Sequence, residues 1–413
     1  MFIEFTVGNF RSFRERVTFS MLAANITAAS ASKHLDEDNV FSTPNKLTLL
    51  RSAAIYGANA SGKSNLIRAL EFMRRFVINS SKESQISDPI KTEPFLLDSE
   101  HQDKPSFFEV IFIVNDSQYR YGFEADQTKI TTEWLYQTPI LGLKLRERQL
   151  FKRAGQDIAL SKKFFTEGKL FLKNTRENAL FLSVCAQFNG ETSTEITNWL
   201  SKLEIISDFT NSNKFSTVDI LNNGVLKPLV SDFLMRFDLG IVDFEIDGEV
   251  KPNNFWFGPK IKTHRRKIDT GEKQIFDLDE NESEGTKKIF ALAGILMFSL
   301  KFGTPLIIDE LDSKLHLLLT QKIIQLFNSS KTNLFNAQLI FTTHDTNLLS
   351  NKIFRRDQIW FTEKDKNEST NLYSLAEYKI RNDASFERAY LEGRFGAVPF
   401  IGDLSQIFEA AHG

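Results

Sequence analysis

The chain has 413 residues, of which 41% are hydrophobic and 25% charged, a balance typical of a soluble globular protein with two or three domains. Its formal net charge of -2 excludes a globally basic nucleic-acid binder, so any such contact needs a local patch. The one cysteine, Cys185, excludes an internal disulfide and fits a reducing compartment. The first residues lack a signal-peptide pattern, and the longest apolar run, Ile289–Leu300, is too short to span a bilayer. We therefore expect a cytoplasmic protein with no membrane partner.

The N-terminal region predicts strands that lead into a helix. Met1–Val7 alternates as a strand does, and Val17–Ala23 is a second candidate. Residues 27–46 are mostly small and polar, which predicts a loop. Leu47–Tyr56 is a buried strand, and Asn65–Asn79 has the apolar periodicity of a helix.

The segment between that strand and that helix, GANASGKS, fits the phosphate-binding pattern G-x-x-x-x-G-K-[ST] at every fixed position. Glycines let successive N–H groups point at phosphate oxygens, and the following helix directs its positive end to the same place. Lys63 would reach the β- and γ-phosphates, and the Ser64 hydroxyl would bind Mg²⁺. The alternative is an ordinary glycine-containing turn. The predicted residues for ATP and Mg²⁺ are Gly57, Ala58, Asn59, Ala60, Ser61, Gly62, Lys63, Ser64 and Asn65.

The middle of the chain changes character twice. Residues 81–174 contain short β-branched and aromatic runs separated by turn signals, which predicts an antiparallel β meander. Residues 175–279 predict a helical and mixed insertion. Its expected helices are Glu177–Phe188, Glu195–Ile206 and Thr217–Phe237, and its expected strands are Ile241–Glu249 and Asn254–Lys262.

Beyond residue 280 helices and strands alternate, which predicts a parallel sheet with helices on its faces. The fold class is therefore α/β, with an ATPase core of the phosphate-loop kind split between residues 1–80 and 280–375, and a C-terminal segment at 376–413. The elements expected in the second half of the core are Thr286–Leu300, Pro305–Ile308, Leu317–Asn328 and Gln338–Thr342.

The apolar strand at 305–308 ends in two acids, Asp309 and Glu310. In phosphate-loop ATPases the strand-end acid holds the Mg²⁺ shell, and a second acid orients or deprotonates the attacking water. Asp309 is thus the candidate metal ligand beside Ser64, and Glu310 the candidate catalytic base. An ordinary exit from strand to loop is the alternative.

Several segments resemble ABC-type ATPases, in the same order. DELDSKLH at 309–316 aligns with the D-E-P-T-S-x-L-D segment, and ESEGT at 282–286 stands where that class has its L-S-G-G-Q signature. The strand at 339–342 leads to a histidine, as the class's switch histidine follows a strand. NFRSF at 9–13 resembles the N-F-[KR]-[SN]-[FY] stretch of the RecF and SMC branch. Taken singly, each of these motifs has an ordinary structural explanation.

The resemblance implies an ABC-type core in which two subunits form a homodimer, or a higher homo-oligomer, with ATP at the interface. Ser283 and Gly285 would cap the γ-phosphate of ATP bound to the second subunit, His344 would contact that phosphate, and Arg11 would lie close to the nucleotide. Two departures are Glu284, in place of the first signature glycine, and His316, in place of aspartate. Gln85 and Gln102 are candidates for the glutamine loop.

The C-terminal region is similar to one prokaryotic family. FRRDQIWFTEKD at 354–365 and YLEGRFGAVP at 390–399 resemble elements of the standalone ABC-type AAA ATPases of abortive-infection and restriction-linked defence modules (RloA-like), relatives of OLD-type and RecF/SMC-type ATPase heads. This implies an Mg²⁺-dependent ATPase that serves as sensor or scaffold in antiviral defence and controls a separate effector, a Toprim or other nuclease. Residues 376–413 would contact that partner or the second subunit.

Two alternatives remain at this stage. One is a RecF/SMC-like DNA-repair ATPase that clamps DNA, and the other is the nucleotide-binding subunit of an ABC transporter, against which the degenerate signature argues. DNA is a candidate partner because of two basic clusters, although a solvated hairpin face would have the same composition. One cluster comprises Lys260, Lys262, Arg265, Arg266 and Lys267. The other is looser and has phenylalanines that could stack on bases: Lys144, Arg146, Arg148, Lys152, Arg153, Lys162 and Lys163, with Phe151, Phe164 and Phe165.

Overall fold

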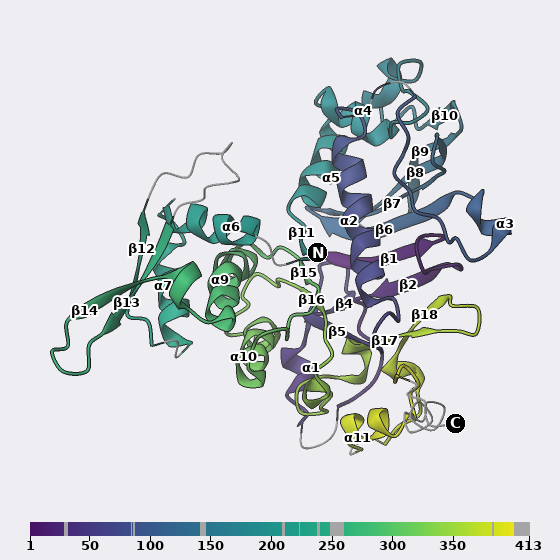
Figure 1. The fold of residues 1–413 in the computed structure, drawn as a ribbon. Coiled ribbons are helices and arrows are strands. Elements are labelled where there is room, and N and C mark those ends of the chain that lie inside the picture. The colour runs from purple at the N-terminus through teal and green to yellow at the C-terminus, as the bar shows by residue number, and fades with distance from the viewer. Residues whose placement is uncertain are drawn as a thin grey trace, which may run out of the picture.

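The computed structural model describes residues 1–28, 32–83, 85, 87–140, 146–208, 211–222, 224–237, 240–247, 260–381 and 384–399. Two large sheets meet along a long helix, and a smaller three-stranded sheet projects from the helical side of the molecule (Figure 1). None of the helices in this described part is both long and apolar enough to cross a bilayer.

The first large sheet is almost entirely parallel, with strand order β11-β15-β16-β5-β17-β18. All neighbours pair in parallel except β18, which returns antiparallel beside β17 at the edge. The carboxyl ends of β15, β16, β5 and β17 therefore lie at one edge, where open α/β sheets bind ligands. The strands are β5 (Ser52–Tyr56), β11 (Glu204–Ile206), β15 (Leu306–Ile308), β16 (Leu339–Thr342), β17 (Ile359–Lys364) and β18 (Thr370–Ser374).

The second large sheet is antiparallel, with strand order β10-β9-β8-β7-β6-β1-β2. Strands β6 to β10 form the predicted meander, and β6 then pairs with β1 from the N-terminus. The sheet contains β1 (Phe2–Gly8), β2 (Val17–Ser20), β6 (Ser106–Val114), β7 (Ser117–Ala125), β8 (Ile130–Pro139), β9 (Arg148–Ala154) and β10 (Asp157–Leu160). Together the two sheets confirm the predicted fold class, an α/β phosphate-loop core of the ABC type with an antiparallel β subdomain.

Helix α2 (Lys63–Asn79) joins the two sheets through its buried apolar face, which includes Leu66, Leu70 and Met73. It runs along the antiparallel sheet in Figure 1, and one hydrophobic cluster contains residues of α2 and of both sheets. Because side chains alternate along β5, Ala53 and Ile55 belong to this cluster, whereas Ala54 and Tyr56 belong to the second cluster on the opposite face.

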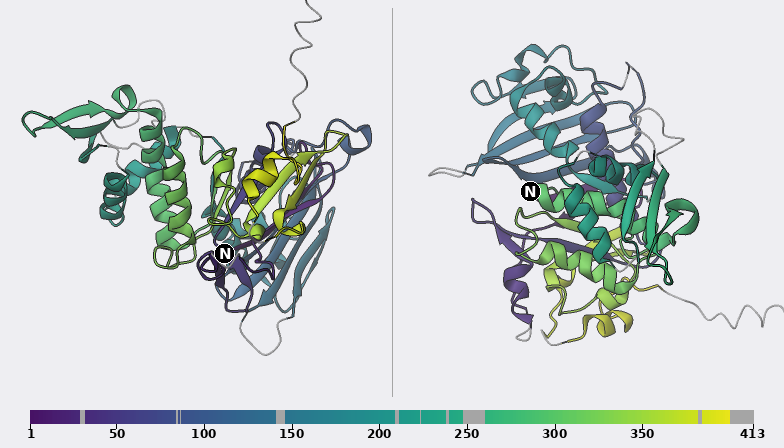
Figure 2. Two further views of the ribbon diagram at one scale, coloured as in Figure 1. Left: turned by 90° about the horizontal axis from the view of Figure 1, so that it is seen from below. Right: turned by 90° about the vertical axis from the view of Figure 1, so that its left-hand side faces the viewer.

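The second cluster is covered by α9 (Glu284–Phe302), α10 (Leu317–Asn328) and α7 (Lys227–Arg236). The three-stranded sheet β12-β13-β14 extends beyond these helices, as two further views make clear (Figure 2). The remaining α-helices and strands are α1 (Leu35–Asp38), β3 (Val40–Ser42), β4 (Thr48–Leu50), α3 (Ser99–Gln102), α4 (Phe181–Gln187), α5 (Glu191–Ser201), α6 (Asn211–Asn222), β12 (Asp243–Asp247), β13 (Lys260–Arg266), β14 (Lys273–Asp277), α8 (Leu278–Asn281) and α11 (Phe386–Leu391). Helices α4 and α5 contact α2, and α6 packs against α9.

The structure differs from the predicted elements in several places. The expected helix at 195–206 ends at Ser201, because the apolar end of that stretch forms β11 and pairs with β15. The expected loop at 27–46 contains α1 and β3. Of the expected strand at 254–262, residues 254–259 lie outside the described residues, and residues 260–266 form β13. Of these differences, the formation of β11 involves pairing with a strand that is distant in sequence, whereas β3 pairs with β4, the next strand along the chain.

A buried ion pair connects the antiparallel sheet to the start of α4. Glu133 on β8 and Arg153 on β9 face each other, and both side chains are fully buried, with 3.6 Å between Arg153 Nη1 and Glu133 Oε2. The Glu133 carboxylate also accepts hydrogen bonds from the Phe181 and Leu182 amides at 2.7 and 3.0 Å. Arg153 donates to the carbonyls of Gly155 and Ala179, both at 2.7 Å. Burial raises the pKa of Glu133, so its charge depends on these partners.

We predict that Arg153→Met lowers the free energy of unfolding by about 3–5 kcal/mol, because Glu133 is left buried without its cation. Chemical denaturation would measure this. Lys152→Met is the control, since Lys152 is the preceding residue of β9 and is exposed; it should change stability by about 0.5 kcal/mol or less. Equal effects of the two substitutions would contradict the structural role of the pair.

Candidate functional site

The phosphate loop follows β5 and ends where α2 begins, at Lys63. Gly57 has φ +154° and Gly62 has φ +113°, conformations that side chains rarely adopt. A Cβ on Gly57 would lie 2.4 Å from the Thr362 carbonyl oxygen, and one on Gly62 would lie 2.4 Å from Thr370 Oγ1. Both positions therefore require glycine for two reasons: the backbone conformation, and the close approach of β17 and β18.

The Lys63 side chain folds back across the loop. Its Nζ donates to the carbonyls of Gly57 and Ala58 at 2.8 and 2.9 Å. Burial lowers the pKa of Lys63 to about 8, and the nearby carboxylates, Asp309 first among them, oppose that shift. A pKa of about 8 leaves the ammonium group mainly charged at pH 7, so a cation lies against the carbonyls of the loop.

The two acids after β15 are held by Thr342 of the neighbouring strand β16. The Thr342 hydroxyl donates to Asp309 Oδ1 and accepts from the Glu310 amide, the latter at 2.7 Å. Glu310 has φ +51° and is exposed, so the chain turns sharply and presents its carboxylate to the pocket. Lys288 of α9 donates to the Glu310 carbonyl at 2.8 Å, and this hydrogen bond stabilises the turn. The Asp309 carboxylate is therefore held in a fixed orientation, which suits a metal ligand. The Glu310 carboxylate is accessible, which suits a base.

His344 follows β16 at the same edge of the sheet. Its amide donates to Asp312 Oδ2 at 3.3 Å, and its ring is exposed. Burial of part of the ring, aided by the positive charge of Lys63, lowers the pKa of His344, whereas the three nearby acids oppose this. The imidazole is accordingly neutral at pH 7 and can donate one hydrogen bond and accept another.

These groups meet in one pocket of about 590 Å³. The structure thus brings together most of the residues that the phosphate-loop pattern and the acidic strand predicted. The lining consists of Ser12, Asn59, Ala60, Ser61, Gly62, Lys63, Ser64, Asn65, Glu310, His344 and Lys364. Gly57, Ala58 and Asp309 lie behind this surface, in contact with Lys63 or Thr342.

The Asn9–Phe13 turn lies against the first turn of α2. Arg11 Nη1 donates to Asn65 Oδ1 at 3.4 Å, and its Nη2 pairs with Glu93 at 2.7 Å. Asn65 in turn donates to Ser12 Oγ at 2.8 Å. Arg11 is therefore one residue removed from the pocket lining, and Ser12 is the residue of this turn that reaches the pocket.

Ser283 and Gly285 lie at the N-terminus of α9 and do not line the pocket. Ser283 is the N-cap and accepts from the Thr286 amide at 3.2 Å. A Cβ on Gly285 would lie 2.9 Å from the Lys314 carbonyl, so glycine permits the close approach of the loop at 313–316. Hydrogen bonds from Lys314 and Lys287 lower the pKa of Glu284 to about 2, so its carboxylate is ion-paired beside this helix end.

Three other predicted features lie away from the pocket lining: His316, the two glutamine-loop candidates and the basic residues. His316 caps α10, its Nδ1 accepting from the Leu318 amide at 3.2 Å, a role that aspartate also fills. Gln85 and Gln102 are absent from the described lining of the pocket. In the looser basic cluster the structure buries Arg153, Phe151 and Phe165, so these residues are not available to nucleic acid, and Lys144 lies outside the described residues. The basic cluster at 260–267 lies on β13 and its hairpin, where Arg265 pairs with Glu282 at 2.6 Å. Lys262 and Lys267 are paired as well, with Asp247 and Glu272.

The C-terminal element packs on the back of β17. Glu363 accepts from the Ala397 amide at 3.0 Å, and Tyr373 donates to the Phe395 carbonyl at 2.8 Å. Phe395 is 3% exposed, whereas the Arg394 side chain is 69% exposed. Phe395 is therefore an anchor in the core, whereas Arg394, like Leu391 and Glu392, is presented to solvent.

Sequence reasoning missed Lys364, Thr342 and Thr370. Lys364 lines the pocket from the end of β17, and Thr370 Oγ1 donates to the Ser61 carbonyl at 2.9 Å. The apolar residues IWF before Thr362 could have predicted a buried strand. The local sequence does not indicate that this strand pairs with β5, and it is this pairing that brings Lys364 to the pocket.

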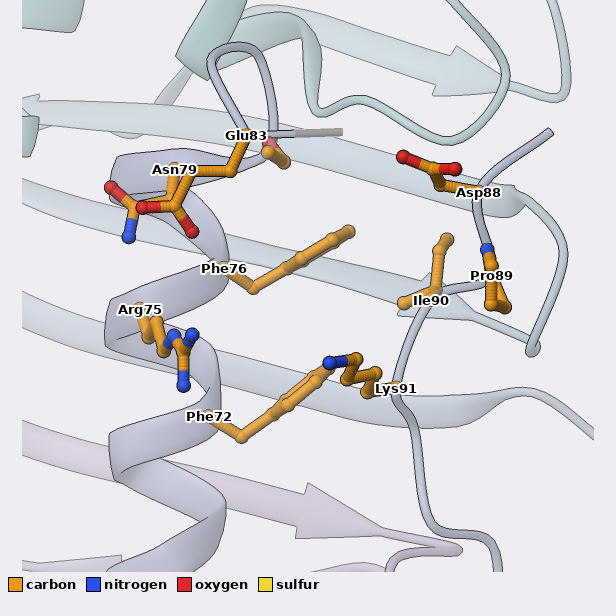
Figure 3. A pocket seen from close by; sticks show the side chains of 10 residues that line it. Phe72, Arg75, Phe76, Asn79, Glu83, Asp88, Pro89, Ile90 and Lys91 are labelled. Atoms are coloured by element: carbon orange, nitrogen blue, oxygen red, sulfur yellow. The ribbon is translucent and has the colours of Figure 1, made fainter. Parts of the chain in front are cut away.

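A separate pocket of about 430 Å³ lies beside the second half of α2. Phe76 points from α2 toward Ile90 and Phe72 toward Lys91, while Asn79 points away from both (Figure 3). Phe72 lies nine residues beyond Lys63, about 14 Å along the helix, and the two pockets share no lining residue. This second pocket is not part of the phosphate-loop site.

The fold and the site define a phosphate-loop protein with an acidic strand beside the loop. The chain belongs to the family described as "AAA domain, putative AbiEii toxin, Type IV TA system", whose model matches residues 52–350, more than half of the chain. No curated protein matches the chain.

Several solved structures resemble the chain weakly. The SMC head domain from Thermotoga maritima has a TM-score of 0.41 at 16% identity, covering 92% of this chain and 99% of its own. An SMC head with an extended coiled coil bound to the C-terminal domain of ScpA, derived from Pyrococcus furiosus, has a TM-score of 0.37 at 11% identity, covering 95% and 98%. The recombination mediator protein RecF-ATPrS of the RecFOR pathway has a TM-score of 0.32 at 14% identity, covering 90% and 98%. These likenesses are too weak to bear on function.

We predict that Gly62→Ala lowers the free energy of unfolding by about 2–4 kcal/mol, from backbone strain and from the clash with Thr370. Gly155→Ala is the matched control, because Gly155 also has a positive φ but a Cβ there would meet nothing within 4 Å; it should cost only about 1 kcal/mol. In a Thr370→Ala background the cost of Gly62→Ala should fall. If chemical denaturation gave the same cost in both backgrounds, the contact with Thr370 would not be the cause.

Proposed function

We propose that the chain is an Mg²⁺-dependent ATPase. The observation that carries this proposal is the single pocket formed by the phosphate loop, Glu310 and His344. The loop amides and Lys63 would bind the phosphates, and Glu310 would accept a proton from the attacking water. His344, neutral and accessible, would hydrogen-bond the γ-phosphate.

The residues present fit a magnesium ion. Ser64 lies in the pocket lining, and Asp309 offers a carboxylate oriented by Thr342, so a hydroxyl and a carboxylate oxygen are available, the ligand types that Mg²⁺ prefers. When bound, the ion would neutralise charge on the β- and γ-phosphates. Arg11 would act from outside the lining, through its hydrogen bond to Asn65.

We further propose that the active form is a homodimer or higher homo-oligomer with ATP between subunits. Ser283 and Gly285 lie at a capped helix N-terminus outside their own subunit's pocket, which supports a role toward another subunit's nucleotide. The ion pairs of Glu284 with Lys287 and Lys314 reduce the repulsion that its carboxylate would exert on phosphate.

The biological role proposed is that of a sensor or scaffold subunit in antiviral defence. The family description, which names a putative AbiEii toxin, supports a defence or toxin–antitoxin setting, and the RRDQIWF and GRFGAVP elements support the RloA-like branch. In this role the ATPase would be cytoplasmic and would control a separate effector, a Toprim or other nuclease. Arg394, exposed on the C-terminal element, is the contact we propose for that partner.

We predict that Glu310→Gln lowers kcat for ATP hydrolysis at least about 100-fold while ATP binding is kept, because only the proton acceptor is lost. ATP should then trap the variant as a dimer in light scattering. Lys63→Ala should abolish binding and dimer formation alike. Ser283→Arg is the companion variant: it should bind ATP normally but fail to dimerise. Wild-type turnover by Glu310→Gln would exclude Glu310 as the base.

A RecF/SMC-like ATPase that clamps DNA is the second candidate. It is favoured by the Asn9–Phe13 turn, which resembles that branch and contacts the first turn of α2. The proposed DNA surface would be the hairpin of β13 and β14. Its basic residues are largely ion-paired, which reduces the charge available for phosphate contacts. A neighbouring nuclease gene would support the first role, and neighbouring replication genes the second.

The two candidates differ in their prediction for DNA. If the hairpin binds DNA, affinity should fall steeply with salt, and Lys260→Gln, Arg266→Gln and Lys267→Gln combined should weaken it about 10-fold or more and reduce the salt slope. Arg265 is left unchanged because its loss would strand the buried Glu282. For the defence ATPase we expect no salt-dependent binding by this hairpin in fluorescence anisotropy, so a steep slope lost in the triple variant would favour the DNA clamp.

A further inference from the structure

Strand β17 presents alternate side chains to the two sides of the sheet. Thr362 Oγ1 lies 2.6 Å from Ser61 Oγ in the phosphate loop, whereas Glu363 holds the C-terminal element through the Ala397 amide. Lys364 is two residues beyond Thr362 and so shares its side of the strand. It lines the nucleotide pocket together with Ser12 and the loop. Nothing in the phosphate-loop or acidic-strand patterns assigns it a role.

The order of the strands determines which end of a nucleotide Lys364 would face. Asp309 and Glu310 follow β15, His344 follows β16, and both strands lie on one side of β5. The γ-phosphate end of a bound nucleotide lies toward these groups, since the strand-end acid and the metal act between the β- and γ-phosphates. β17 lies on the other side of β5. Lys364 therefore borders the half of the pocket left for the α-phosphate and the nucleoside.

The present partner of Lys364 is exchangeable. Its Nζ pairs with Glu368 Oε2 at 2.7 Å across the tip of the β17–β18 hairpin, and the two side chains are 32% and 60% exposed. Exposed pairs of this kind contribute little, so a polyphosphate with several negative charges would compete effectively for the lysine. The tip itself is anchored to the site, because the Thr370 amide donates to the Ser12 carbonyl at 2.7 Å.

We propose that Lys364 is a nucleotide-binding residue that contacts the α-phosphate side of the bound nucleotide, opposite the catalytic acids. It then contributes equally to the affinity for ADP and for ATP and has no part in hydrolysis. Glu368 limits that contribution because it forms an ion pair with Lys364 and so competes with the nucleotide for the ammonium group. The inference rests on the proposed nucleotide binding by this pocket.

The test is calorimetric titration of the full chain with Mg²⁺–ADP and, in the Glu310→Gln background, with Mg²⁺–ATP. Lys364→Gln should raise the Kd about 10-fold for both nucleotides, while kcat at saturating ATP in the Glu310 protein stays within about twofold, as expected for uniform binding. Lys364→Arg should restore most of the affinity, and Glu368→Gln should tighten binding of both nucleotides about two- to threefold.

Lys366→Gln is the matched control, since it removes the same charge from the exposed tip of the same hairpin but does not touch the pocket lining. Its Kd values should equal those of the wild type. Equal effects of Lys364→Gln and Lys366→Gln, an effect on ATP alone, or no effect on either nucleotide would overturn the assignment of Lys364. A wild-type protein that binds neither nucleotide would instead overturn the proposed function, and a lower melting temperature for Lys364→Gln alone would mark its effect as structural.

Discussion

The parallel pairing of β5 with β16 on one side and with β17 on the other determines what the site can contain. The three strands end at the same edge of the sheet. Their backbone pairing therefore places the phosphate loop, His344 and Lys364 side by side. β15 adds the two acids one strand further on. The glycines of the loop follow from this arrangement, because β17 and β18 approach Gly57 and Gly62 more closely than a Cβ allows.

The parts of the fold and of the site that could be predicted from the sequence are those whose pattern lies within one short segment. The phosphate loop, the acidic strand and the helix at 317–328 are of this kind, and the structure has that helix at the same residues. The β meander was also readable, because its strands are consecutive and joined by turns. In each case local periodicity and turn residues carry the information.

What could not be read depends on pairing between distant segments. β11 has three residues and is a strand only because β15 lies beside it, about 100 residues later in the chain. Thr342 and Lys364 are ordinary residues in sequence, and their place beside Asp309 and the phosphate loop follows from sheet order. Phe395 lies in the C-terminal segment that was expected to contact a partner or the second subunit, yet aromatic packing against Tyr378 and Phe361 buries it.

The bond between Arg265 and Glu282 gives the projecting sheet a mechanical connection to the site. Glu282 is almost completely buried, also accepts from Thr263 at 2.7 Å, and immediately precedes Ser283, the cap of α9. A load applied at the tip of the β13–β14 hairpin would therefore be transmitted along β13 to the first turn of α9. From α9, Lys288 donates to the Glu310 carbonyl, so a continuous series of contacts connects the projecting sheet with the acidic strand.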